Sequence, residues 1–131
     1  MSVLDPKFDA LALNARLQLD QGLTVACYCA GWCDTCTQYR PGFDELAALW
    51  PQHTFVWVDI EESPELLDDD DVENFPTILI QDPQKGNLFY GTMLPHIAHL
   101  ERLISHLDEA SPAIEGGPAS LRTLLLPPAA Q

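Results

Sequence analysis

Basic residues are scarce in this sequence of 131 residues. Six Lys and Arg stand against twenty Asp and Glu, which gives a formal net charge of −14. A protein that binds nucleic acid uses Lys and Arg to neutralise phosphates, and docking on an anionic membrane also relies on basic residues. The charge balance therefore argues against nucleic acid and membrane surfaces as partners, and it favours solubility.

Long hydrophobic runs are also lacking. The N-terminal stretch carries Asp5, Lys7 and Asp9 and does not resemble a secretory signal. The apolar runs near the C-terminus, such as Leu124–Leu126, are far too short to cross a bilayer. The sequence therefore predicts a soluble, cytoplasmic protein of one domain, and we expect it to be a monomer.

Cysteine is sparse but concentrated. The four cysteines are Cys27, Cys29, Cys33 and Cys36. In a reducing compartment such cysteines are more often catalytic or metal-binding than structural disulfides. Structural zinc usually takes two separated pairs of ligands that converge tetrahedrally. A strand that feeds a helix would spread these four sulfurs along one line, so the spacing favours redox chemistry over a metal site.

The hydrophobic pattern predicts alternating helices and strands. Helices are expected over Phe8–Gln21, from Cys33 onward, in a short segment opened by Ser63–Pro64–Glu65, and after Pro95. Strands are expected over Leu23–Ala30, His53–Ile60, Pro76–Gln81 and Leu88–Gly91. This order predicts an α/β protein, a three-layer α/β/α sandwich around a mixed sheet of four strands, or five if Met1–Lys7 adds an edge strand.

Two further details of the pattern are specific enough to check. In the first helix, Phe8, Ala12, Ala15 and Leu19 form the predicted buried stripe, with Gly22 as the C-terminal stop. After Ala110 the composition changes, since four of the eleven prolines and Gly116–Gly117 follow. We therefore expect a domain over residues 1–110 and a flexible C-terminal tail over residues 111–131.

The segment Trp32-Cys33-Asp34-Thr35-Cys36 sits where a predicted buried strand ends and a helix begins. A thiol at this turn faces unsatisfied backbone N–H groups and the positive end of the helix dipole, which favours the thiolate. The second thiol, one turn into the helix, can reach back and close a small disulfide ring. This arrangement suits a dithiol in which Cys33 attacks a substrate disulfide and Cys36 resolves the mixed disulfide.

At this point the sequence resembles the thioredoxin family over roughly residues 8–110. The resemblance rests on Trp32-Cys33-x-x-Cys36, Pro41, Asp59, Phe75-Pro76-Thr77 and Gly91. It implies the thioredoxin fold, with Cys33 as exposed nucleophile, Cys36 as buried resolving thiol, and protein disulfides as substrates. It also implies that no metal or organic cofactor is needed beyond the redox-active disulfide Cys33–Cys36, and that electrons come from a thioredoxin reductase or a small thiol.

The resemblance also implies a substrate-binding surface. Pro76 aligns with the family's cis-proline, which places the backbone of residue 75 beside the cysteines as a docking edge for an extended substrate. The implied substrate-binding residues are Trp32, Asp34, Thr35, Phe75, Pro76, Tyr90 and Gly91. Asp34-Thr35 replaces the Gly-Pro of the commonest thioredoxins. The carboxylate of Asp34 opposes the thiolate that the helix terminus favours, and the two effects are comparable in size.

A second departure concerns proton transfer. Thioredoxins usually carry a buried Asp on the strand before the motif and a Lys on the neighbouring strand, and the corresponding residues here are Cys27 and Trp57. Neither is a general base at neutral pH in apolar surroundings. This departure leaves open an alternative function, a thioredoxin-like binding or chaperone module with weak turnover.

Cys27 and Cys29 alternate with Tyr28, so both should point to one face of the strand. A packing role is the simplest interpretation, because free cysteine is among the most buried residue types. A sharper hypothesis is that Cys27 forms an alternative disulfide with Cys36, which would make the protein a redox sensor.

Overall fold

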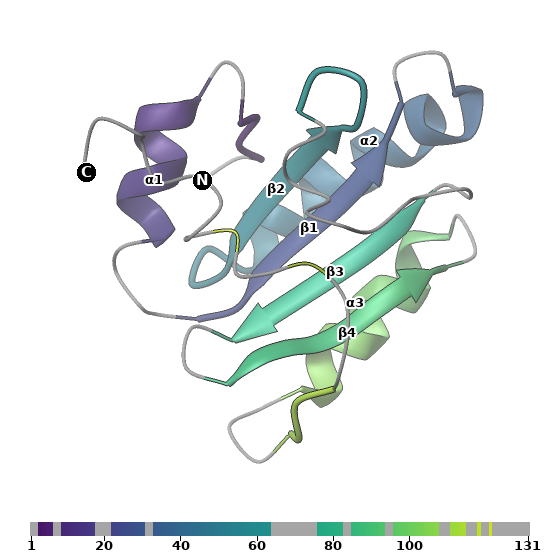
Figure 1. Cartoon of the computed structure of the whole chain (residues 1–131). Helices are drawn as coiled ribbons and strands as arrows, with labels where there is room; N and C mark the ends of the chain where they lie inside the picture. Colours follow the sequence, from purple (N-terminus) through teal and green to yellow (C-terminus); the bar gives the residue numbers. More distant parts are fainter. Residues whose placement is uncertain are drawn as a thin grey trace.

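The computed structural model describes residues 3–6, 9–17, 22–30, 33–63, 76–82, 85–93, 96–107, 111–114, 118 and 121. The elements in chain order are α1 (Ala10–Leu17), β1 (Thr24–Cys29), α2 (Asp34–Leu49), β2 (Thr54–Asp59), β3 (Thr77–Asp82), β4 (Gly86–Thr92) and α3 (Ile97–His106) (Figure 1). None of the described helices is long and apolar enough to cross a membrane.

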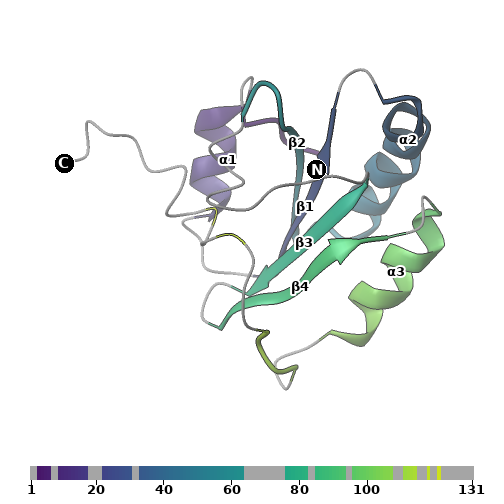
Figure 2. The same cartoon turned by 45° about the vertical axis from the view of Figure 1, so that its right-hand side comes forward.

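The four strands form one mixed sheet in the order β2-β1-β3-β4. β1 is parallel to β2 and antiparallel to β3, and β3 is antiparallel to β4. Figure 2 shows α1 on one side of this sheet and α2 and α3 on the other. The predicted three-layer α/β/α sandwich with a central mixed sheet is confirmed.

Both faces of the central strand β1 are buried, which explains its continuous apolar sequence. Val25, Cys27 and Cys29 belong to the core cluster that α2 and α3 cover. Ala26 and Tyr28 belong to the cluster on the α1 side. Alternation along a strand thus assigns the two strand cysteines to the same layer as α2.

Within the described residues 3–6, the N-terminal segment extends the sheet by one residue pair. Leu4 forms an isolated parallel bridge with Val56 of β2. The Leu4 N–H donates to the Phe55 carbonyl oxygen at 2.9 Å, and the Trp57 N–H donates to the Leu4 carbonyl oxygen at 3.0 Å. In the described part of the possible fifth strand, the pairing beside β2 is thus a single bridge.

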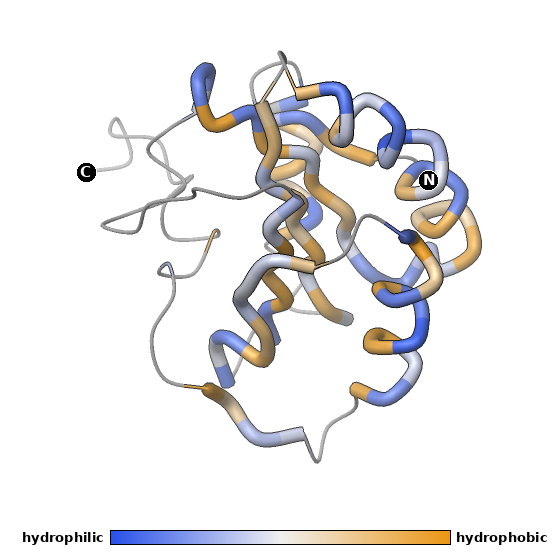
Figure 3. The backbone as a smooth tube through the Cα atoms, turned by 90° about the vertical axis from the view of Figure 1, so that its right-hand side faces the viewer, coloured by the Kyte–Doolittle hydropathy of each residue, from blue (hydrophilic) through white to orange (hydrophobic). Residues whose placement is uncertain are grey.

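α2 continues through Pro41, which lies on its exposed side. Its buried residues are Cys36, Tyr39, Phe43, Leu46 and Ala47. The tube in Figure 3 accordingly alternates between hydrophobic and hydrophilic colours along the helices. α3 packs close to α2 at Gly42, where an added Cβ would lie 3.0 Å from the Cβ of Ile97.

The buried stripe of α1 differs from the predicted one. Leu13 and Leu17 are buried, whereas Ala12 and Ala15 are exposed. The segment is apolar on several sides, with Leu11 89% exposed, so its periodicity does not single out one face. Phe8 and Leu19 lie outside the described residues, and so does the helix predicted after Ser63. Gly22 has a φ of 67°, a left-handed conformation that favours glycine. Residues 18–21 lie outside the described residues, so the predicted helix stop at Gly22 stays a prediction.

Part of the predicted flexible tail packs on the sheet. The Ile114 N–H donates to the Asn87 carbonyl oxygen at 2.8 Å, and the Leu121 N–H donates to Oε1 of Gln81 at 3.0 Å. The Leu121 side chain is fully buried in the cluster on the α1 side. Burial of this apolar side chain stabilises the contact. Most of residues 115–131 lie outside the described residues, so the flexible tail stays a prediction there.

Candidate thiol–disulfide site

Cys33 caps the N-terminus of α2. Its N–H donates to the Ala30 carbonyl oxygen at 3.0 Å, and its carbonyl oxygen accepts from the Thr37 N–H at 3.2 Å. Its side chain makes no capping hydrogen bond. The thiol is free and partly exposed, and it packs against the edge of the core cluster. Cys33 therefore has the position predicted for an accessible nucleophile at the positive end of a helix dipole.

Cys36 lies in the first turn of α2 and is disulfide-bonded to Cys29 at the end of β1. The two Cα atoms are 5.9 Å apart, and both side chains are buried. The structure therefore does not contain the predicted Cys33–Cys36 disulfide, nor the alternative Cys27–Cys36 pair. Cys29 is the partner because it is the last residue of β1, and the chain turns directly from there into α2.

Cys27 is a free, fully buried thiol two residues before Cys29 in β1. Its Sγ atom lies 3.7 Å from the Sγ atom of Cys29, which confirms that the two strand cysteines share one face. Burial raises the pKa of the Cys27 thiol well above its ordinary range, and the charge of Arg40 offsets this only in part. Cys27 is thus a neutral thiol at physiological pH and cannot act as a general base.

Cys27 pairs directly with Trp57 across β1 and β2. The guanidinium of Arg40 stacks over the Trp57 ring at 5.0 Å from its centroid and pairs with Asp44 at 3.0 Å. Nearby, the Tyr39 hydroxyl is buried and has no hydrogen-bond partner among the described residues, and burial raises the pKa of Tyr39. Positions 27 and 57, where thioredoxins usually carry an Asp and a Lys, therefore hold a neutral thiol and an indole ring. The Arg40 guanidinium covers that indole ring.

Two of the predicted substrate-binding residues lie at the strand ends next to the cysteines. Pro76 is buried directly before Thr77, which pairs with Tyr28, the neighbour of Cys29. The Pro76 carbonyl oxygen accepts from the Met93 N–H at 3.2 Å. Gly91 pairs with Ile78 at the same end of the β3–β4 hairpin. Trp32 and Phe75 lie outside the described residues.

Tyr90 lies on the opposite face of the sheet. Its ring packs edge-on against Tyr28 at 6.4 Å between centroids, in the layer that contains α1. Tyr90, one of the implied substrate-binding residues, therefore does not lie in the same layer as Cys29 and Cys36. Tyr90 pairs with Leu79, and the alternation along β4 turns its side chain away from the layer of Cys29 and Cys36.

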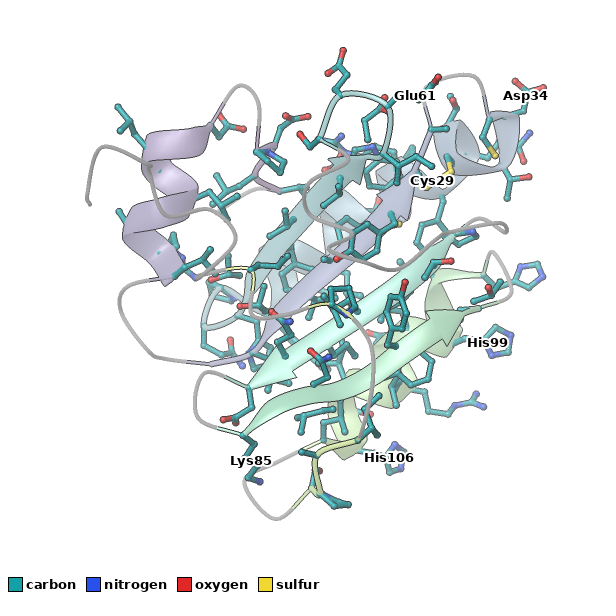
Figure 4. All side chains as sticks on the ribbon, in the orientation of Figure 1. Cys29, Asp34, Glu61, Lys85, His99 and His106 are labelled. Carbon is teal, nitrogen blue, oxygen red and sulfur yellow. A yellow bond between two sulfur atoms is a disulfide. The ribbon has the colours of Figure 1, made fainter. Side chains whose placement is uncertain are left out.

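Asp34 and Thr35 occupy the first turn of α2, Asp34 exposed and Thr35 half-buried. Figure 4 shows Asp34 and Glu61 at the same end of the molecule as Cys29, and Lys85 at the other end. These two carboxylates, here called the acidic rim, thus lie at the Cys29 end of the molecule. Among the residues that the structure describes, no three His, Cys, Asp or Glu side chains are grouped so that they could hold a metal ion.

Sequence reasoning missed two participants in this site. The sequence pattern favours a packing role for Cys29, although its place at the strand end, seven positions before Cys36, is a signal for pairing. Arg40 received no role, because its position over Trp57 depends on how α2 packs across β2.

A mixed sheet between helical layers, with a free thiol at a helix N-terminus above a buried disulfide, defines a thioredoxin-fold protein with a thiol–disulfide site. The sequence model of the thioredoxin family matches residues 6–105. The chain belongs to the thioredoxin family.

Individual relatives agree with this assignment. Thioredoxin H5 of rice (Oryza sativa subsp. japonica) is 39% identical over 61 residues, which cover 46% of this chain and 45% of the relative. The thioredoxin of Chlamydia trachomatis is 34% identical over 67 residues, which cover 51% of this chain and 66% of the relative. The chain therefore spans less than two thirds of the length of these relatives.

Solved structures show the same fold at lower sequence identity. The germline-specific thioredoxin Deadhead of Drosophila melanogaster superposes with a TM-score of 0.65 at 20% identity, over 82% of this chain and 99% of that one. Thioredoxin NaTrxh of Nicotiana alata gives a TM-score of 0.64 at 23% identity, over 79% and 90% of the two chains.

Proposed function

We propose that the protein is a thiol–disulfide oxidoreductase that reduces disulfides in protein substrates. One observation carries the proposal most directly. Cys33 presents a free, partly exposed thiol at the N-terminus of α2, three residues before a buried cysteine that already takes part in a disulfide. Dithiol exchange requires an accessible thiol and a second cysteine close to it that can form a disulfide, and once its disulfide is reduced Cys36 would supply that second thiol.

In the proposed cycle the Cys33 thiolate attacks one sulfur of the substrate disulfide. A mixed disulfide forms, and the other substrate sulfur leaves as a thiolate that takes up a proton. Cys36, as a thiolate, then attacks the Cys33 sulfur, which releases the second substrate thiol and leaves a Cys33–Cys36 disulfide. Two electrons and two protons pass from the dithiol to the substrate. A thioredoxin reductase or a small thiol restores the dithiol, with no metal or organic cofactor.

The strand ends beside Cys33 suit an extended substrate. Pro76 and Gly91 lie at the same end of the sheet as Cys29, and main-chain hydrogen bonds to such an edge supply affinity with little demand on substrate side chains. The acidic rim at Asp34 and Glu61 would favour substrates whose disulfide lies near basic residues. We place this activity in the cytoplasm, on a monomer.

Reduction of a protein disulfide such as that of insulin, with dithiothreitol as donor, tests the function. Cys33→Ser should lose all turnover above the background of dithiothreitol. Cys36→Ser should instead accumulate a mixed disulfide between Cys33 and the substrate, visible by mass spectrometry. Cys27→Ala is the matched control, because it removes a buried cysteine from the same cluster and should keep turnover.

A binding module with weak turnover is the second candidate, and the residues at positions 27 and 57 favour it. The neutral Cys27 thiol and Trp57 offer no proton acceptor beside Cys36. A binding module would retain its partner in the Cys33→Ser variant, whereas a reductase would lose turnover. Equal disulfide reduction by the wild type and Cys33→Ser would rule out the reductase.

A further inference from the structure

We propose that Cys29 is a second internal partner of Cys36, so that one disulfide moves between a surface pair, Cys33–Cys36, and a buried pair, Cys29–Cys36. This inference rests on the proposed function, because it concerns the regulation of the same dithiol. In the surface state Cys33 and Cys36 carry out reduction. In the buried state Cys36 is occupied, and Cys33 is left without a resolving thiol.

The geometry places Cys36 between two possible partners. Cys29 and Cys36 are joined with their Cα atoms 5.9 Å apart, a separation usual for disulfides. Cys33 begins the helix that contains Cys36 in its first turn, and it packs against the same core cluster. Cys36 is therefore bonded to the end of the strand and lies three residues from Cys33 at the start of the helix.

The exchange needs no external oxidant. The Cys29 thiol loses its proton to water, and its thiolate attacks the Cys36 sulfur of a Cys33–Cys36 disulfide. The bond between Cys33 and Cys36 breaks, the bond between Cys29 and Cys36 forms, and Cys33 leaves as a thiolate that water can protonate. The number of disulfides is unchanged. The reverse step is attack by the exposed Cys33 thiolate on Cys36, which releases Cys29.

Burial sets the rate and the role of this exchange. Cys29 is 1% exposed and lies in apolar surroundings, which disfavour the thiolate that must attack. The exchange is therefore slow compared with turnover, and it sets the fraction of active molecules rather than taking part in each cycle. The same burial shields the Cys29–Cys36 disulfide from reductants in solution, whereas a Cys33–Cys36 disulfide includes one partly exposed sulfur.

Cys27 provides a matched comparison. It lies on the same strand face as Cys29, is equally buried, and has its sulfur 3.7 Å from that of Cys29. Yet Cys27 is free, since it lies deeper along β1 than the residue that faces the start of α2. Removal of Cys27 should therefore leave the exchange intact, and removal of Cys29 should abolish it.

Disulfide mapping of the full chain tests the proposal. The reduced protein is oxidised with glutathione disulfide, quenched with acid and labelled with N-ethylmaleimide after several intervals. Chymotryptic cleavage after Tyr28 and Trp32 puts Cys29 on its own peptide, and the position of the label within Cys33–Tyr39 distinguishes Cys33 from Cys36. We expect Cys33–Cys36 first and Cys29–Cys36 later, with the label on Cys33.

The reductase activity should change with the disulfide state that the mapping finds. The initial rate of protein-disulfide reduction should fall in proportion to the fraction of molecules linked through Cys29 and Cys36. Cys27→Ala should show the same decline. Cys29→Ala should show none, relative to its own rate before oxidation. Cys33→Ser, a change of similar size at a partly exposed position, should retain the fold and form Cys29–Cys36 directly on oxidation.

The outcomes separate this proposal from the proposed function. If the wild type reduces protein disulfides but oxidation yields only Cys33–Cys36, with Cys29 labelled throughout, the second partner is wrong and the reductase stands. If Cys33–Cys36 forms first and is replaced by Cys29–Cys36, but the reduced protein has no turnover at all, the exchange is supported and the reductase fails.

Discussion

Cys27 of β1 is the direct register partner of Trp57 of β2. In the thioredoxins that this sequence resembles, these two positions usually hold a buried Asp and a Lys. Here the thiol is fully buried and neutral, and the indole lies under the Arg40 guanidinium. No group at these positions can accept a proton from Cys36, so we expect the resolving step to be slow.

Introducing the Asp and Lys that thioredoxins usually carry at positions 27 and 57 should speed the resolving step. We predict that Cys27→Asp combined with Trp57→Lys accelerates release of the substrate thiol by about tenfold or more, since a positioned acid–base group typically contributes about 10²–10⁴. The two changes belong together, because an unpaired buried carboxylate costs several kcal/mol. Single-turnover kinetics of a preformed mixed disulfide measures the rate. Cys27→Ala is the control, and a folded double variant with an unchanged rate would show that proton transfer is not limiting.

His53 should make stability depend on pH. Its Nδ1 accepts a hydrogen bond from the Leu23 N–H at 2.9 Å, and burial lowers the pKa of His53. The folded protein therefore binds fewer protons than the unfolded chain near the ordinary pKa of 6.5. Stability from this group is complete above that pH and decreases as the pH falls below it.

Urea unfolding between pH 7.5 and pH 5 measures this dependence. His53→Asn retains an acceptor for the Leu23 N–H but cannot titrate, so its unfolding midpoint should fall less steeply with acidification than that of the wild type. His99→Asn changes an exposed histidine and should follow the wild type. Parallel curves for all three proteins would contradict the assignment to His53.

The C-terminal segment should contribute to stability through one side chain. Leu121 is 0% exposed, and we predict that Leu121→Ala lowers the free energy of unfolding by about 2–5 kcal/mol. Ile114→Ala is the matched control, because Ile114 is 42% exposed and its hydrogen bond to Asn87 uses only the backbone. It should change stability by less than about 0.5 kcal/mol. Equal effects of the two substitutions in urea unfolding would refute the packing of Leu121.

The sheet and the position of Cys33 could be predicted because local patterns determine them. A continuous apolar run from Leu23 to Ala30 corresponds to β1, and the transition at Cys33 to helical periodicity corresponds to α2. The buried face of α1 could not be predicted, because the helix itself carries apolar residues on several sides. Only packing against β2 selects Leu13 and Leu17.

The partner of Cys36 and the face of Tyr90 depend on long-range geometry. Whether Cys29 or Cys33 bonds to Cys36 is decided by how the chain passes from β1 into α2, a choice that residue spacing alone leaves open. The side on which Tyr90 packs follows from the register between β3 and β4. Likewise, the burial of Leu121 depends on an apolar layer formed by α1 and the sheet, distant in sequence.

The reduction potential of the Cys33–Cys36 pair tests the central claim most directly. The full chain is equilibrated in thiol redox buffers, alkylated and quantified by mass spectrometry, alongside Cys29→Ala, in which only the surface pair can form. The proposed reductase predicts a value near about −270 mV, the value of a thioredoxin that remains reducing against glutathione. A value above about −200 mV would contradict it, because the pair would then oxidise substrate thiols instead.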